Sequence, residues 1–459
     1  MSEHDQIQHS IDIPDDKILD WIIGSVTDVD ANDTSQPSSA AKKIPRVPSM
    51  LSEKHNYEEC FAPQDVSIGP YHYEEPKLQA FEELKPVMAS SLFKHRPGAL
   101  ISLYKKVGEE EMMKDLRSFY EQDSTTKYSD KVFIKMMLLD SCFILYFMLY
   151  VHMGGSSRAY GSLFKSFDLV LSVWGDLLLL ENQIPFKLLQ MMNIWNETYI
   201  FKNIQALIHN IYMLRSSDQK RTWLKSILCI RSDQQRLESE LTGDNAPDHL
   251  LHLLYLTHIP KDVSMKYKNK EYNYNSNNFP TVNQLLDVGI RFKQCDPISL
   301  KHVRFSKGWF EFSAAVQLPP ITLSGETKPL LLNLIAYETG SGKDECFASY
   351  VCLLRSLIGS HEDVRVLKKA GVLQHRFGTD NDVVDFFNEI AADLIPQNEA
   401  YVELKDDIQS YYEGCSNTPI SDLRREYRKS PWKFISLLGA LIALFLTAVQ
   451  TYFAVWSRK

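Results

Sequence analysis

The stretch from Phe434 to Trp456 constrains this chain more than any other feature. It reads FISLLGALIALFLTAVQTYFAVW and contains no Asp, Glu, Lys, Arg or His. As a helix, its 23 residues would extend about 35 Å, which exceeds the roughly 30 Å hydrocarbon core of a bilayer. Twelve of the residues are Leu, Ile, Phe or Val, and each of these favours insertion by about 0.3–0.6 kcal/mol. We therefore expect a single-pass transmembrane helix, with anchor residues Phe434, Leu438, Leu441, Leu444, Phe445, Val449 and Trp456.

The residues on either side of this stretch predict its orientation. The basic residues Arg424, Arg425, Arg428, Lys429 and Lys433 precede it, whereas only Arg458 and Lys459 follow it. Because basic residues are enriched on the cytosolic side of membrane spans, we expect the preceding domain to be cytosolic. The position of the stretch near the end of the sequence predicts a tail-anchored protein inserted after translation. The sequence does not distinguish the plasma membrane from the endoplasmic reticulum.

Small residues lie on one side of the predicted anchor. Ser436 and Ala440, and likewise Gly439 and Ala443, are four residues apart and so share a helical face. Small residues let transmembrane helices approach closely, which suggests self-association through the anchor.

The roughly 430 residues before the anchor are sufficient for one large helical domain or for two closely packed ones. A net charge of −8 gives no indication of nucleic acid as a partner. The N-terminus lacks the basic start and apolar core of a secretory signal, and the 7 cysteines are scattered, which favours reduced thiols.

Polar composition sets the domain boundaries. We expect a partly disordered leader over residues 1–41, a helical domain over 42–430, the anchor over 431–456 and a short tail over 457–459. An Asn-rich insertion over about 261–279 separates two halves of the helical domain.

Hydrophobic spacing predicts a predominantly α-helical fold. The repeats of three and four residues indicate amphipathic helices over 76–92 and 100–120, and later over 347–358, 364–373, 383–394 and 401–412. Ser129–Met153 is long and apolar enough to resemble a second membrane span, but Asp140 inside it favours a buried central helix. Alternating apolar residues around Lys307 and Gly308 predict a small β-hairpin.

Three acidic residues in apolar surroundings are the candidates for chemistry. Asp176 and Glu181 are five residues apart near Pro185, and Asp140 interrupts the predicted buried helix. Buried carboxylates need hydrogen-bond partners, and such a group could also act as a general acid or base. The simpler interpretation of Glu181–Gln183 is the start of a helix from Ile184.

Other motifs fail on their details. His249 and His252 share a helical face, but no third metal ligand lies nearby in the sequence, which favours a helix end packed on the core. Thr339–Asp344 reads TGSGKD, yet Tyr337 replaces the first glycine of a phosphate loop and Asp344 replaces its Ser or Thr. We therefore expect a surface loop there, and no cofactor or metal.

Several strings in the chain resemble the plant family called domain of unknown function 247. They include IPRVPSML at 44–51, APQDVSIGPYH at 62–72, MMLLDSCFIL at 136–145 and DLLLLENQIPF at 176–186. LLNLIAYE at 331–338, SPWKFISL at 430–437 and LTAVQTYF at 446–453 follow in the same order. The resemblance implies a plant, membrane-associated, mostly helical protein and transfers no catalytic residue. Some grass members are linked genetically to self-incompatibility, which implies recognition between proteins.

These observations predict a membrane-anchored protein that acts by protein–protein recognition, with the bilayer and an unknown protein as partners. The loops at 231–248 and 261–279 are the candidate recognition surfaces. The alternative is an enzyme with an unrecognised acidic site around Asp140, Asp176 and Glu181.

Overall fold

A computed structural model describes most of the domain and the predicted anchor. The described residues are Asp20, Ile22, 43–152, 164, 166–192, 246–259, 279–295, 299–308, 313–392, 394, 396, 400–416, 418–419, 421–422, 424–425 and 431–456. Apart from Asp20 and Ile22, the leader lies outside this description. The Asn-rich insertion through residue 278, residues 231–245 and the two Asn-X-Thr glycosylation motifs of the sequence, at Asn32 and Asn196, also lie outside it.

The chain divides into two compact units, and the division does not follow the order of the sequence. Unit 1 comprises residues 1–263 and 324–347, whereas unit 2 comprises residues 264–323 and 348–459. The segment 324–347 therefore leaves the second half of the chain to complete the core of unit 1.

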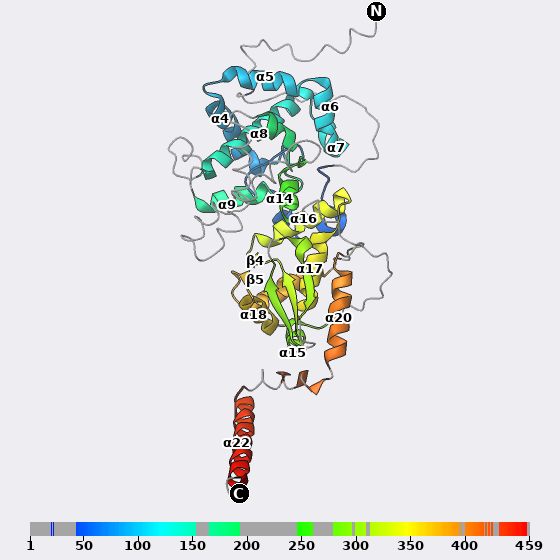
Figure 1. The fold of residues 1–459 in the computed structure, drawn as a ribbon. Helices are drawn as coiled ribbons and strands as arrows, with labels where there is room; N and C mark the ends of the chain where they lie inside the picture. The colour runs from blue at the N-terminus through cyan, green and yellow to red at the C-terminus, as the bar shows by residue number, and fades with distance from the viewer. Residues whose placement is uncertain are drawn as a thin grey trace, which may run out of the picture. The chain divides into compact units, whose positions relative to one another are not determined.

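Unit 1 is helical and is organised around one buried helix. Helix α8 (Asp130–His152) packs against α4 (Gln79–Phe93) and α5 (Pro97–Val107), which Figure 1 labels, and also against α10 (Phe186–Met191). Helix α16 (Thr327–Ser341) packs against α3 (Tyr57–Cys60) and α14 (Leu250–His258). The helices are α2 (Ser49–Ser52), α3 (Tyr57–Cys60), η2 (Pro76–Leu78), α4 (Gln79–Phe93), α5 (Pro97–Val107), α6 (Glu110–Ser118), α7 (Gln122–Thr126), α8 (Asp130–His152), α9 (Phe167–Asp176), α10 (Phe186–Met191), α14 (Leu250–His258) and α16 (Thr327–Ser341).

The burial of α8 confirms the interpretation of Ser129–Met153 as a core helix. Among the described residues, Asp130–Val151 alone is both long and apolar enough to cross a membrane, and 94% of its apolar window is buried. Aromatic side chains of neighbouring segments pack on it, such as Phe164, whose ring centroid lies 5.3 Å from that of Phe147. The apolar surface of α8 is therefore buried against other side chains of unit 1, as in the core helix of a folded domain.

Unit 2 combines helices with two small sheets. A three-stranded sheet has the order β1-β3-β2, in which β1 and β3 are parallel and β2 and β3 are antiparallel. The antiparallel pair confirms the predicted hairpin, and β4 and β5 form a separate parallel pair. The elements are α15 (Val282–Asp287), β1 (Ile290–Gln294), η5 (Leu300–His302), β2 (Arg304–Lys307), β3 (Ala314–Leu318), β4 (Ile321–Leu323), α17 (Cys346–Leu357), α18 (His361–Lys369), β5 (Leu373–His375), α19 (Asp380–Ala391), α20 (Val402–Ser416) and α22 (Pro431–Trp456).

Two expected helices differ from the structure for local reasons. The stretch 100–120 forms α5 and α6, which are separated at Gly108 and Glu109. Helix α18 ends at Lys369, because Gly371 has φ +72° and redirects the chain into β5. Glycine adopts this left-handed conformation without the clash that a Cβ would cause.

Helix α22 contains the predicted anchor. It has 26 residues, but the continuous apolar stretch with described side chains, Gly439–Phe453, is shorter than a membrane span. Of the seven anchor residues, Leu441, Leu444, Phe445 and Trp456 are exposed, and Val449 is partly buried. The side chains of Phe434 and Leu438 lie outside the description.

Candidate functional site

The three candidate acids all lie in unit 1 and all bind one irregular segment, which we call the strap (residues 43–75). The strap contains only the short helices α2 and α3, yet about half of its residues from Ile44 to His72 are buried, including the whole run from Val66 to Pro70. Four prolines within these residues, at positions 45, 48, 63 and 70, interrupt regular secondary structure. Because buried backbone groups need hydrogen-bond partners, side chains must supply those that a helix or sheet would otherwise provide.

Asp176, at the end of α9, binds three consecutive amides of the strap. Its Oδ1 accepts a hydrogen bond from the Gln64 N–H at 2.8 Å. Its Oδ2 accepts from Asp65 and Val66 at 2.7 and 2.9 Å. Burial raises the pKa of Asp176 to about 6, and the three amide donors oppose this rise.

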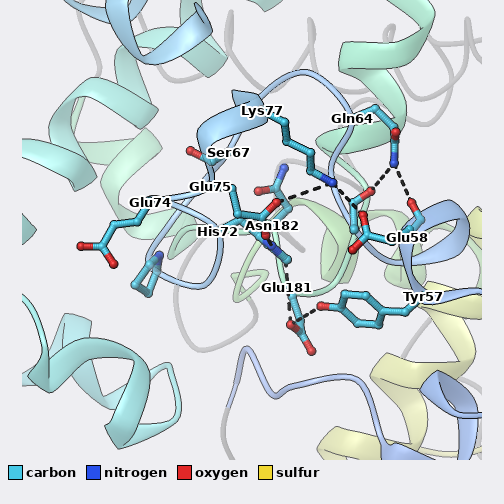
Figure 2. A network of polar contacts seen from close by, with 12 residues as sticks. Tyr57, Glu58, Gln64, Ser67, His72, Glu74, Glu75, Lys77, Glu181 and Asn182 are labelled. Carbon is cyan, nitrogen blue, oxygen red and sulfur yellow. Dashed lines mark hydrogen bonds and ion pairs between the residues drawn. The ribbon is translucent and has the colours of Figure 1, made fainter. Parts of the chain in front are cut away.

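Glu181 binds the strap at two further points. One carboxylate oxygen accepts from the Val47 N–H at 2.7 Å, and the other accepts from the Tyr57 hydroxyl at 2.9 Å. Figure 2 shows Glu181 between Tyr57 and His72, whose Nε2 lies 3.9 Å from the carboxylate. Burial, together with the charge of Glu181, raises the pKa of Tyr57 far above its ordinary value, so this phenol remains a hydrogen-bond donor.

Asp140, on α8, forms a buried ion pair that also binds the strap. Its Oδ2 accepts from the Gly69 N–H at 2.7 Å, and its Oδ1 lies 2.5 Å from the Lys85 ammonium. Lys85 donates to the Ser67 carbonyl at 2.7 Å and contacts Glu82 as well. Although burial alone would lower it, the carboxylates of Asp140 and Glu82 hold the pKa of Lys85 above its ordinary value.

The neighbouring amides complete the attachment. Asn182 Oδ1 accepts from the Ile68 N–H at 2.6 Å, and its amide nitrogen donates to the Val66 and Asp176 carbonyls. The interpretation of Glu181–Gln183 as a helix start is therefore wrong, since α10 begins only at Phe186. These residues precede Pro185 in a non-helical turn, where their side chains are committed to the strap and to nearby backbone.

This geometry favours a structural role for the acids over catalysis. Asp140, Asp176 and Glu181 are only 1%, 2% and 3% exposed, and their oxygens accept hydrogen bonds from donors of the chain itself. A general acid or base must reach a proton on the substrate. Such a side chain would have to give up a strap contact first.

Lys85 and Asn333 are important residues that the sequence reasoning missed. Lys85 lies on the same helical face as Phe81 and Met88. A lysine on this apolar face is the sequence feature that could have indicated a buried ion pair. Asn333, inside the apolar α16, accepts from the Leu180 N–H at 2.8 Å and donates to the Cys60 carbonyl at 2.8 Å. It thereby joins the turn after α9 to the strap.

His249 and His252 lie at the start of helix α14. The His249 side chain accepts from the His252 N–H and caps the helix, while the His252 imidazole lies 3.0 Å from the Asp248 carboxylate. Burial and the nearby His252 lower the pKa of His249 to about 3, so its ring is neutral. Within the described residues, no cluster of three or more His, Cys, Asp or Glu side chains could hold a metal ion.

The TGSGKD string ends a helix rather than opening one. Helix α16 continues to Ser341, and Gly342 caps it with φ +60° while its N–H bonds to the Glu338 carbonyl. A phosphate loop places amides at the positive N-terminal end of a helix. This position has the opposite polarity and does not suit an anion.

Comparison with known proteins gives a family match over most of the chain. The model of the family DUF247, described as a plant protein of unknown function, matches residues 44–446. The UPF0481 protein At3g47200 of Arabidopsis thaliana is 25% identical over 433 residues, covering 87% of this chain and 83% of that protein. The putative UPF0481 protein At3g02645 of the same plant is 29% identical over 180 residues, covering 39% and 33% respectively. No solved structure matched significantly.

Proposed function

The chain belongs to the plant protein family of unknown function DUF247, and we propose that it is a membrane-anchored protein that acts by recognising other proteins. In this proposal α22 crosses the bilayer once, while unit 1 and the part of unit 2 that precedes α22 remain on the cytosolic side. The exposed apolar surface of α22 is the observation that carries it.

Helix α22 exposes large apolar side chains along its described length. Leu444, Phe445 and Phe453 are 68%, 67% and 64% exposed, whereas outside α22 the exposed large hydrophobic residues of the described chain are Met50 and Val87. An apolar surface of this kind requires a cover, which lipid would provide. The whole helix would extend about 39 Å, enough to cross a hydrocarbon core of about 30 Å with some tilt.

Two threonines of α22 are compatible with lipid. The Thr447 hydroxyl donates to the Ala443 carbonyl at 2.8 Å, and the Thr451 hydroxyl donates to the Thr447 carbonyl at 2.8 Å. Because these hydroxyls bond within the helix, they do not remain unsatisfied in hydrocarbon. The five basic residues between Arg424 and Lys433 support the cytosolic orientation of the preceding units.

Self-association through α22 is a part of the proposal that its sequence supports. Ser436, Ala440, Ala443, Thr447 and Gln450 follow one another at spacings of four and three residues. This spacing places them on one helical face, where small and polar side chains favour helix contacts in membranes.

We favour recognition of proteins over catalysis, because each of the three acids on which the enzyme alternative depends is already bound to the strap. The strap contacts of Asp140, Asp176 and Glu181 already use the groups on which an enzyme mechanism would depend. The proposed recognition loops, 231–248 and 261–279, lie almost entirely outside the described residues.

Extraction of membranes with alkaline carbonate tests the anchor. We expect the full-length chain to stay with the membrane pellet and a chain ending at Ser430 to move to the supernatant. Equal release of both forms would refute the anchor.

Protease treatment of sealed vesicles tests the orientation: the units should be digested from outside, whereas protection together with glycosylation at Asn196 would reverse it. Proximity labelling from the full chain, compared with the truncated chain, then identifies partners that depend on the anchor.

A further inference from the structure

The three-stranded sheet of unit 2 has a basic outer face. The strand register places Arg291, Ala315 and Ser306 in one row across the sheet, and Lys293, Gln317 and Arg304 in the next. The alternate residues Phe292 and Val316 are buried, so the two rows point away from the core. None of the six outer residues is acidic. We call this surface the basic sheet face.

Within the described part of the chain, the three cations of the basic sheet face have no acidic partners. Arg291, Lys293 and Arg304 are exposed, and none of them forms an ion pair among the residues that the structure describes. By contrast, Arg365 and Lys368 in the same unit both pair with Asp380. The chain as a whole is acidic, with a net charge of −8, so this local excess of positive charge is not a property of the general surface.

The cations are close enough to act together. Neighbouring strands are about 4.8 Å apart, so the side chains of β1 and β2 on either side of β3 start about 10 Å apart. This separation is close to the Debye length of about 8 Å at physiological ionic strength. A flat anionic surface against the sheet would therefore meet the three charges at once, while salt would screen more distant acidic groups.

From these observations we infer that the basic sheet face binds the anionic lipid headgroups of the membrane in which α22 is anchored. The complementary charge and the exposure of the face select an anionic partner. The cytosolic leaflet of a membrane carries a negative surface potential, and each basic side chain near it strengthens binding about fivefold. Three side chains together contribute about 100-fold, and anchoring by α22 would raise the local lipid concentration further.

A nucleic acid fits this face less well than lipid does. Single strands are held by aromatic side chains on which bases stack, and the six outer residues include no aromatic ring. The inference rests on the proposed membrane location, so its test must separate the sheet from the anchor.

Binding between two membranes provides this separation. The full chain is reconstituted into nanodiscs of phosphatidylcholine, which occupy α22, and is then sedimented with vesicles of phosphatidylcholine and phosphatidylserine. Unaltered protein is compared with the triple variant Arg291→Gln, Lys293→Gln, Arg304→Gln. A control variant removes the same charge from exposed positions of unit 1 (Lys106→Gln, Lys114→Gln, Lys131→Gln). Equal circular dichroism spectra and melting temperatures verify the fold of each protein.

We expect salt-sensitive binding to the anionic vesicles, a loss of about 100-fold in the sheet variant and a loss of less than about threefold in the control. Equal losses in both variants, or no vesicle binding by the unaltered protein, would overturn the inference. Binding of polyglutamate or single-stranded RNA without vesicle binding would likewise overturn it. If alkaline carbonate releases the full chain, the proposal that α22 is a membrane anchor is refuted. Sedimentation with the same vesicles, without nanodiscs, then still tests whether the basic sheet face binds anionic lipid.

Discussion

The ion pair between Lys85 and Asp140 provides a sharp test of how the strap is held. We consider Lys85→Met, which keeps much of the apolar stem and removes the ammonium group. The Lys85 side chain is 0% exposed and contacts Asp140, Glu82 and the Ser67 carbonyl. Its removal leaves the Asp140 carboxylate buried without a cation and the Ser67 carbonyl without its donor.

Removing one partner of a buried ion pair destabilises proteins by about 3–5 kcal/mol. We therefore expect Lys85→Met to lower the free energy of opening the strap by about this amount. Adding Asp140→Asn should restore about 1–3 kcal/mol, because the uncompensated charge disappears while the Ser67 carbonyl stays unsatisfied.

Lys77→Met is the matched control. Lys77 pairs with Glu58 and Glu75, but its side chain is 39% exposed, and such surface pairs contribute about 0–1 kcal/mol. The same chemical change should therefore have a small effect at this position.

Hydrogen exchange of the full-length chain in detergent, measured by mass spectrometry on peptides that cover Val66 to Gly69, reports the opening directly. A change of 3–5 kcal/mol corresponds to protection factors lower by about 100-fold to 4,000-fold. A loss of less than tenfold in Lys85→Met would refute the reasoning. The single variant Asp140→Asn is measured beside the double variant. If the changes in the free energy of opening caused by Lys85→Met and by Asp140→Asn simply add in the double variant, the reasoning is refuted as well.

Three further predictions concern the same unit. Folding raises the pKa of Asp176 from 3.8 to about 6, so the folded state holds this proton more tightly than the unfolded state does. The resulting stabilisation of about 3 kcal/mol is complete below pH 3.8 and is lost as the pH rises through 6. Urea unfolding from pH 4 to 7.5 should therefore depend less on pH in Asp176→Asn, and an unchanged profile would contradict this. Asn333→Ala should cost about 2–4 kcal/mol in urea unfolding, because it removes the partners of Leu180 and Cys60; a cost below about 1 kcal/mol would show that these groups find other partners. Gly342→Ala should cost about 1 kcal/mol in thermal unfolding, since Gly342 has φ +60° although its surroundings are open, and a neutral effect would contradict this explanation of its role.

The strap shows why the candidate acids could be found but not interpreted from the sequence. A carboxylate in an apolar run, such as Asp140, indicates that a buried partner exists. It does not identify Gly69 and Lys85, which lie 71 and 55 residues away in the chain. The four strings that carry the family resemblance at 44–51, 62–72, 136–145 and 176–186 include two stretches of the strap and all three acids that bind it.

The predicted helices followed from local spacing, and their errors arose where single residues redirect the backbone. The left-handed Gly371 ended α18 before the expected residue, and Pro185 separated the polar residues from α10. The apolar segment 330–337 fits a strand or a helix by its sequence alone, and in the structure it is buried inside unit 1 as part of helix α16.

The sequence alone determined the family, the mostly helical fold, the core helix at Asp130–His152 and the apolar character of α22, because periodicity and local strings carry this information. Only the tertiary structure decided that residues 324–347 complete unit 1, and that three acids separated in the chain serve as hydrogen-bond acceptors for one strap. The physical reason is that a buried backbone amide can be satisfied by any acceptor that the fold brings within about 3 Å, and distance along the chain does not restrict which one.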